Sequence, residues 1–298
     1  RLSKVGMVTD AEWVDINGDG WQDLVVIGEF MAIEVFTNDG GKSLEQETKR
    51  FFDSPLNGLW NRMVMQDFDK DGDQDFIVGN LGLNTQLKSN SSEPLELYYK
   101  DFDKNGSIDP ILTCYIQGKP YPFPSRDELL DQMYSMRSKF TNYASYAKAS
   151  LHNIFSKADL KDAGVLRATN LESIYLENRN GKLIPHKLPT EAQFSPIYAI
   201  AVVDYDRDGN LDFVVGGNQS SIRIRLGVID ANFGQLFKGD GKGNFQYVNQ
   251  STSGLRLTGD VRSLKMIQVR GSSYLVVGTN NVGVSAYALN NFSSRNDY

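Results

Sequence analysis

The chain has 298 residues and a formal net charge of −6, with 40% hydrophobic and 23% charged residues. This composition is typical of a folded globular protein, long enough for one large β domain or two ordinary ones. We find no apolar run of the 18 residues that a membrane span needs, and no basic stripe of the kind that binds nucleic acid. We therefore expect neither direct membrane insertion nor nucleic-acid binding.

An acidic pattern, D-x-D/N-x-D/N-G-x-x-D, recurs four times, and each copy runs into a β-branched, apolar segment. We number the copies loop 1 (residues 15–23), loop 2 (67–75), loop 3 (101–109) and loop 4 (204–212). The copies read "DINGDGWQDLVVIG", "DFDKDGDQDFIVGN", "DFDKNGSIDPILTC" and "DYDRDGNLDFVVGG". A fifth apolar run, "YLVVGTNN" from Tyr274, is similar to the strand half of the unit but lacks the acidic loop. Self-similarity at this spacing indicates a repeat architecture.

Each repeat predicts about four short antiparallel strands. Apolar runs flank the acidic loops, and hairpin-like segments at residues 33–46, 173–186 and 235–248 supply further strands. Units in series that cannot bury their faces alone favour a β-propeller. We predict an all-β fold in which residues 1–298 form a single β-propeller of four-stranded antiparallel blades. Five blades are favoured, with a larger ring as the alternative, and the N-terminal "RLSKVG" would close the ring.

The spacing of the repeats is uneven. Only 34 residues separate Asp67 from Asp101, which predicts a second blade with abbreviated outer strands. The long interval after loop 3 holds a helical insertion at residues 124–164. Ser125 and Glu128 form a capping box there, and Gly164 is expected to close the last helical turn. Apolar residues at helical spacing predict one face that packs on the propeller: Leu129, Leu130, Met133, Met136 and Phe140.

The acidic loops have the donor types of a calcium site. Side-chain oxygens at positions 1, 3, 5 and 9 and the carbonyl of position 7 converge if the chain turns sharply at position 6, which is glycine in every loop. Oxygen-only coordination suits Ca²⁺ better than Mg²⁺, which keeps several waters in a tighter octahedron. An EF-hand is excluded because position 12 is never glutamate and the flanking segments are β-like.

The alternative interpretation is that the loops are merely polar turns, since Asp, Asn and Gly dominate turns of every kind. Electrostatics favours metal binding, because two carboxylates about 4 Å apart repel by about 4 kcal/mol at an effective dielectric near 20. A divalent cation reverses the sign. We therefore predict up to four Ca²⁺ sites, with these residues as ligands: Asp15, Asn17, Asp19, Trp21 and Asp23; Asp67, Asp69, Asp71, Asp73 and Asp75; Asp101, Asp103, Asn105, Ser107 and Asp109; Asp204, Asp206, Asp208, Asn210 and Asp212. Position 7 is expected to act through its carbonyl, so the Asp73 side chain should point away from the ion.

At these residues the sequence resembles the FG-GAP and VCBS repeat family, the calcium-binding blades of integrin α-subunit heads and of many exported bacterial proteins. The loops, the "VG" strand endings at Gly79 and Gly216, and the turns "NDGGKSL" and "GDGKGNF" carry the resemblance. The segments "GLWNRMVMQDFDKDGDQDFIVGNLGLN", "YPFPSRDELLDQM" and "YASYAKASLHNIF" are similar to a bacterial subgroup of VCBS-repeat proteins that often end in an ASPIC/UnbV module, which is absent here. The resemblance implies an extracellular or cell-surface propeller that binds calcium, and no established reaction.

The leading functional interpretation is a rigid, calcium-stabilised module for binding or adhesion, with a glycan or a protein as its partner. The alternative is a polysaccharide-acting enzyme, a lyase or hydrolase, because paired carboxylates can act as acid and base. The loop aspartates already have a coordinating role, and no Ser-His-Asp order, HExxH motif or phosphate loop occurs. We therefore expect no enzymatic activity and name no catalytic residue.

Two sets of aromatic residues bear on where a partner binds. Tyrosines suit sugar stacking or protein contacts, although the three in the insertion are equally explained by helix packing. They are Tyr134, Tyr143 and Tyr146. The tryptophans lie before or inside the repeats, and we predict that they pack in the core. They are Trp13, Trp21 and Trp60.

Overall fold

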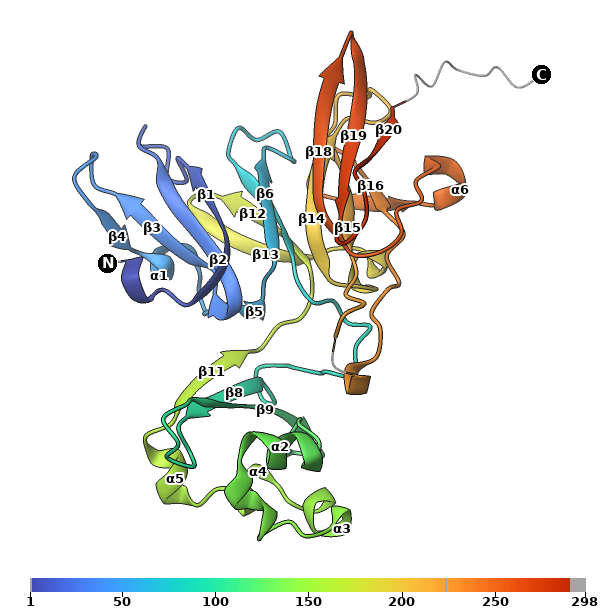
Figure 1. Ribbon diagram of the computed structural model, residues 1–298. Helices are drawn as coiled ribbons and strands as arrows, with labels where there is room; N and C mark the ends of the chain where they lie inside the picture. The colour runs from blue at the N-terminus through green and yellow to red at the C-terminus, as the bar shows by residue number, and fades with distance from the viewer. Residues whose placement is uncertain (1, 223, 290–298) are drawn as a thin grey trace. The chain divides into compact units, whose positions relative to one another are not determined.

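The computed structural model describes residues 2–222 and 224–289 (Figure 1). Its secondary structure is mostly antiparallel β-strand, in agreement with the all-β prediction. The chain divides into two compact units: unit 1 is built from residues up to 55, 59–86 and from 171 onward, and unit 2 from 56–58 and 87–170. Among the described residues, no helix has the length and apolar character needed to cross a membrane.

Unit 1 contains four sheets, which we name I, II, IV and V. Sheet I has the order β1 (Met7–Val14), β2 (Asp23–Ala32), β3 (Glu34–Asn38), β4 (Leu44–Gln46). Sheet II has the order β6 (Arg62–Gln66), β7 (Asp75–Gly79), β12 (Ile174–Arg179), β13 (Lys182–Lys187). Sheet IV has the order β14 (Ile197–Val203), β15 (Asp212–Gly217), β16 (Gln235–Gly239), β17 (Phe245–Val248). Sheet V has the order β18 (Val261–Val269), β19 (Ser272–Thr279), β20 (Ser285–Ala288).

The acidic loops all occupy the same topological position. Loops 1, 2 and 4 join the first two strands of sheets I, II and IV. In sheet V the corresponding connection is the two-residue turn Arg270–Gly271, with φ of 50° and 80°. Positive φ at both central residues is the geometry of a tight hairpin turn. The last unit therefore keeps the strands and has lost the acidic loop, as the sequence predicts.

Sheet II is assembled from two distant parts of the chain. β7 pairs with β12, where Phe76 lies opposite Leu176, so residues 87–170 enter between the second and third strands of this sheet. The prediction of abbreviated outer strands in the second blade is therefore wrong. The hairpin at residues 173–186 completes sheet II, and repeat spacing could not reveal this because the inserted segment carries an acidic loop of its own.

Neighbouring sheets of unit 1 share apolar cores. Between sheets II and IV the buried aromatic rings include Phe68, Tyr175 and Phe213, and Phe68 meets both others edge to face. Between sheets IV and V, Leu236 packs with Leu275 and its neighbours. The first strands lie next to one another in chain order, with β1 against β6, β6 against β14 and β14 against β18 (Figure 1). Unit 1 thus places its sheets side by side.

The N-terminal segment does not close a ring by joining sheet V. Leu2–Lys4 forms a short 3₁₀ helix, and Val5 packs on a cluster in sheet I that includes Leu24 and Phe36. Short helices elsewhere in unit 1 are α1 (Thr48–Phe51), α6 (Gln250–Ser253) and the 3₁₀ turns Thr190–Gln193 and Ile224–Leu226.

The tryptophan predictions are right for one residue of three. Trp60 is fully buried, whereas the Trp13 and Trp21 side chains lie at the surface, with 54% and 48% of their area exposed.

Unit 2 consists of sheet III and short helices. Sheet III has the order β10 (Lys119–Pro122), β9 (Asp109–Ile116), β8 (Leu95–Lys100), β11 (Gly164–Ala168), and loop 3 joins β8 to β9. The strand β5 (Asn57–Leu59) precedes sheet II in the chain. The helices are α2 (Arg126–Gln132), α3 (Tyr143–Ala147), α4 (Leu151–Ile154), α5 (Lys157–Lys161) and the 3₁₀ turn Tyr134–Arg137.

The predicted helical insertion is present within unit 2, with some changes. The capping box is confirmed, because the Ser125 amide donates to Glu128 Oε2 (2.7 Å) and the Glu128 amide donates to Ser125 Oγ (3.3 Å). Gly164 starts β11 instead of ending a helix, opposite Tyr99, whose ring leaves no space for a Cβ. The predicted apolar face packs on Ile111 of β9, in its own unit.

Candidate metal centres

The backbone of each acidic loop turns twice through the left-handed region. Position 6 is glycine in all four loops, and a Cβ there would meet no atom within 4 Å. Glycine is therefore required by the backbone conformation and not by crowding. The φ values at position 6 are 88°, 99°, 91° and 80° for Gly20, Gly72, Gly106 and Gly209. The φ values at position 4 are 74°, 65°, 62° and 62° for Gly18, Lys70, Lys104 and Arg207.

These turns allow the same four hydrogen bonds in every loop. The amide of position 6 donates to the side chain of position 1, position 5 to position 3, position 7 to position 5, and position 2 to position 9. In loop 2 the Gly72 amide is 3.2 Å from Asp67 Oδ2, and the Asp73 amide is 2.9 Å from Asp71 Oδ1. The backbone thereby orients the side-chain oxygens of each loop.

In three loops the carboxylates converge. Within each group, one oxygen from every aspartate lies within 4.8 Å of the others. The groups are Asp67, Asp69 and Asp71 in loop 2, Asp101, Asp103 and Asp109 in loop 3, and Asp204, Asp206 and Asp212 in loop 4. Loop 1 has Asn17 at position 3, whose Oδ1 accepts from the Asp19 amide (2.9 Å).

The residues at position 7 lie apart from these groups. Asp73 is exposed and is not a member of the loop 2 group. The Asn210 Oδ1 atom accepts from Lys70 Nζ (2.7 Å), so this side chain connects loop 4 to loop 2. Trp21 is exposed beside Gly41, and Ser107 is exposed as well.

Two oxygens in the loops are buried without a hydrogen-bond partner: Asp67 Oδ1 and Asp204 Oδ1. Both belong to position 1, inside the convergent groups of loops 2 and 4. A buried carboxylate oxygen without a partner costs about 1–3 kcal/mol or more, which a coordinated cation would offset. The oxygen-only donor set and these two atoms therefore fit a hard cation such as Ca²⁺.

The aspartates at position 9 have a second task that the sequence did not reveal. They are at most 2% exposed, and three of them bind the backbone of the third strand of their sheet. Asp75 Oδ1 accepts from the Asn178 amide (2.9 Å), and Asp212 Oδ1 accepts from the Gly239 amide (2.9 Å). Burial raises the pKa of both carboxyls to about 6. These side chains connect loops 1, 2 and 4 to the third strand of their sheets.

In sheets I, II and IV the third strand also sets the charge beside the loop. In sheet IV, Lys238 Nζ contacts Asp206 Oδ2 and lies 2.9 Å from Asp208 Oδ2. These ion pairs raise the pKa of the lysine and lower that of Asp208. Lys238 follows Phe237, the residue opposite Phe213 in sheet IV. The residue at the same place is Thr37 in sheet I, after the partner of Leu24, and Glu177 in sheet II, after the partner of Phe76. Sequence reasoning missed this position, since its partners become apparent only from the pairing of the second and third strands of each sheet.

The arrangement defines a class: a β-sheet protein in which repeated acidic loops join the first two strands of successive sheets. The model of the FG-GAP-like repeat family matches residues 15–78, which include loops 1 and 2. This match confirms the resemblance to the FG-GAP-like repeat family. A search of curated proteins found no match to the chain.

Proposed function

We propose that the protein is a calcium-stabilised β-propeller module that binds a glycan or a protein outside the cell or at its surface. The observation that carries the calcium proposal is the pair of unpartnered oxygens, Asp67 Oδ1 and Asp204 Oδ1, within groups of convergent carboxylates. The side chains at positions 1, 3, 5 and 9 and the carbonyl of position 7 would hold each ion. Calcium would neutralise the repulsion between carboxylates and so rigidify the first hairpin of each sheet.

The propeller proposal is supported by how the sheets of unit 1 pack. Their first strands lie next to one another, and apolar cores fill the space between sheets II and IV and between sheets IV and V. The FG-GAP-like match at residues 15–78 spans loops 1 and 2, strands β2 to β4 of sheet I and most of the first two strands of sheet II, and is consistent with a repeat of this kind.

The proposal that the protein binds a partner and does not catalyse a reaction is supported by the hydrogen bonds that the loop carboxylates already accept. Each position-1 and position-9 carboxylate accepts hydrogen bonds from its own loop, which is the behaviour of a scaffold. Unit 2 offers exposed aromatic surface: Tyr134 and Tyr143 are 75% and 65% exposed. Arg126 lies 5.1 Å from the Tyr143 ring centre, and Tyr146 instead packs on the helices. Exposed tyrosines of this kind suit sugar stacking or protein contacts.

The calcium proposal is tested by counting sites and measuring stability. Titration with Ca²⁺ in a calorimeter should show up to four sites, and Asp67→Ala and Asp204→Ala should each remove one. Asp73→Asn is the matched control, because position 7 acts through its carbonyl. At a calcium concentration of about 100 Kd each site adds roughly 2.7 kcal/mol, so chelator should lower the melting temperature by many degrees. An identical transition in calcium and chelator would refute calcium binding.

The binding proposal is tested separately. Glycan arrays and surface-protein panels should give hits, and Tyr134→Ala with Tyr143→Ala should weaken those hits if unit 2 is the contact surface. Any glycan hit is then incubated with the protein and examined for shorter products. Turnover would contradict the proposal of a non-enzymatic module.

A further inference from the structure

The first strands of the four sheets of unit 1 surround one hollow, which we call the four-sheet hollow. Neighbouring first strands are in contact, β1 with β6, β6 with β14 and β14 with β18. The hollow measures about 290 Å³, and each of these strands contributes to its wall. Glu12 lines it from β1, Arg62 and Gln66 from β6, Ile200 from β14 and Lys265 from β18. Residues of four sheets, far apart in the sequence, therefore meet at one site.

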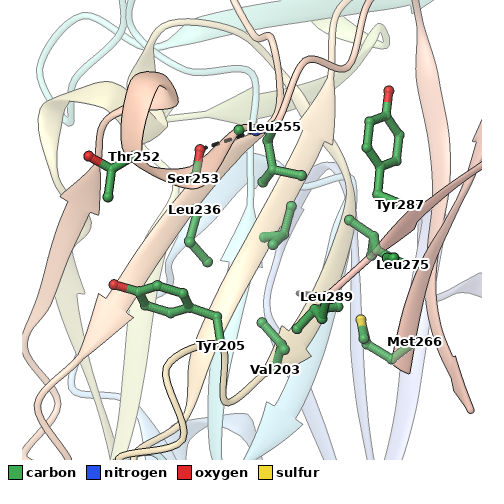
Figure 2. A pocket seen from close by; sticks show the side chains of 13 residues that line it. Val203, Tyr205, Leu236, Thr252, Ser253, Leu255, Met266, Leu275, Tyr287 and Leu289 are labelled. Atoms are coloured by element: carbon green, nitrogen blue, oxygen red, sulfur yellow. Dashed lines mark hydrogen bonds between the residues drawn. The ribbon is translucent and has the colours of Figure 1, made fainter. Parts of the chain in front are cut away.

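The four-sheet hollow differs in chemistry from the hollow beside it. The hollow between sheets IV and V measures about 330 Å³ and is lined mainly by apolar side chains such as Val203, Leu236 and Leu275 (Figure 2). Met266 contributes to the walls of both hollows. The four-sheet hollow instead has four long polar side chains in its wall: Glu12, Arg62, Gln66 and Lys265.

One of these polar groups is held by an ion pair within the protein. Arg62 Nη1 lies 3.4 Å from both carboxylate oxygens of Asp10. Asp10 Oδ2 also accepts from the Met63 amide (2.9 Å), so the Asp10 side chain joins β1 to β6. The guanidinium of Arg62 is therefore a fixed part of the wall.

Glu12, Gln66 and Lys265 are available to a ligand. Within residues 2–222 and 224–289, none of these three side chains makes a hydrogen bond. Burial and the nearby charge of Asp10 raise the pKa of Glu12, and Arg62 acts in the opposite direction. The hollow thus presents a carboxylate that accepts, an ammonium that donates and an amide that does both.

The charge and size of the four-sheet hollow define the class of ligand. Asp10 and Glu12 carry negative charge, and Arg62 and Lys265 carry an equal positive charge, so the wall has no net charge. This balance disfavours a strongly anionic or cationic ligand. Hydroxyl groups both donate and accept, so they match a wall that does the same. The volume is at the lower end of the range of small-molecule sites, roughly 300–1,000 Å³, which limits the ligand to about one sugar ring.

We propose that the four-sheet hollow binds a single uncharged sugar ring of a glycan. Glu12 accepts hydrogen bonds from the sugar hydroxyls, Lys265 and Gln66 donate to them, and the apolar side chain of Ile200 contacts the ring carbons. This inference rests on the proposed function of glycan binding, and it assigns the sugar to unit 1 instead of the exposed tyrosines of unit 2.

The probes for the test are glucose, galactose and mannose, each with its amino sugar and its uronic acid. NMR titration of the whole chain should show that at least one of the three neutral hexoses shifts the amide signals of residues 64–66 and 264–266, with a Kd on the order of 1 mM. The amino sugar and the uronic acid of that hexose should bind at least about fivefold more weakly, because each brings a net charge into a neutral site.

Variants of the polar groups assign the binding to this hollow. Glu12→Gln and Lys265→Met should each weaken hexose binding by about fivefold or more. Lys265→Glu makes the wall net negative, so the amino sugar should then bind more tightly than the neutral hexose, a reversal that a merely structural role of Lys265 would not produce. Lys242→Met, on an exposed turn of sheet IV, is the matched control and should leave binding unchanged. All four variants should keep the melting temperature of the parent to within about 2 °C.

Three results would overturn the proposal. They are a titration in which no hexose shifts these signals, shifts that persist unchanged in Glu12→Gln and Lys265→Met, and an unchanged order of affinities in Lys265→Glu. Failure of this site is distinguishable from failure of the proposed function. Glycan-array hits that survive Glu12→Gln but not Tyr134→Ala with Tyr143→Ala would retain glycan binding and reject the hollow, whereas an array without hits for the parent would reject glycan binding itself.

Discussion

The Tyr175 hydroxyl donates a hydrogen bond of 2.8 Å to the carboxylate of Asp75, which lies 100 residues earlier in the chain. Both side chains are at most 2% exposed. Asp75 is the last residue of loop 2 and begins β7, whereas Tyr175 belongs to β12. The bond therefore joins the two halves of sheet II across the sequence that unit 2 occupies, and it links the acidic loop to the aromatic core.

Tyr175→Phe tests this relationship. The change removes the hydroxyl and leaves the ring in place, so a buried carboxylate loses one of its donors. We expect the free energy of unfolding to fall by about 1–3 kcal/mol, measured by urea denaturation. Tyr143→Phe is the control, because its hydroxyl bonds to the exposed Asp127 and its loss should change stability by less than about 0.5 kcal/mol. Equal effects of the two changes would show that the hydrogen bond does not contribute.

Removal of unit 2 tests whether sheet II forms without it. The two chain segments that flank the insertion already meet, since the Gly82 amide donates to the Leu171 carbonyl (2.8 Å) and the Asn80 amide to Ser173 Oγ (3.0 Å). A short Gly-Ser linker in place of residues 87–170 should therefore give a folded protein with a cooperative thermal transition. Its calcium titration should lose the single site of loop 3. A chain that remains unfolded would show that unit 2 is needed for sheet II to form.

The charged residue beside a loop is expected to change the calcium affinity of that loop. Lys238 pairs with two predicted ligands of loop 4, whereas Glu177 holds the corresponding place beside loop 2. Lys238→Thr, which installs the residue type of Thr37 in sheet I, should raise the affinity of loop 4 about two- to fivefold, the equivalent of the roughly 0.5–1 kcal/mol of a partly exposed ion pair. Isothermal titration calorimetry of a variant in which only loop 4 can bind calcium would measure this affinity. Lys242→Thr, on an exposed turn of the same sheet, should leave the affinity unchanged.

Position 6 of the loops predicts a backbone effect. Gly72 has φ of 99° with open space around it, so Gly72→Ala introduces backbone strain without a clash. We expect a loss of about 1–2 kcal/mol of stability, measured by denaturant unfolding in chelator. Gly283→Ala is the matched control, because that glycine also has open space but no positive φ. If the two substitutions had the same effect, the left-handed turn would not explain the glycine.

Local sequence predicted the elements whose cause is local. The acidic loops, their glycines, the strands after them and the capping box of Ser125 depend on residues a few positions apart, so spacing alone reveals them. The same patterns indicated the FG-GAP-like family that residues 15–78 match. Burial followed pattern less well. Trp60 is buried, but Trp13 on β1 and Trp21 in loop 1 are exposed. A repeat pattern does not say which side of a strand faces a neighbouring sheet.

The sequence by itself determined that this protein is built of β-strands joined by oxygen-rich loops, because side-chain period, glycine conformation and carboxylate chemistry act over one turn of chain. Only the tertiary structure decided that β12 completes the sheet begun by β6, and that Lys238 and Glu177 lie beside loops 4 and 2. Strand pairing joins Phe76 to Leu176, 100 positions apart, through backbone groups that every residue carries. The local pattern therefore does not specify which strands pair.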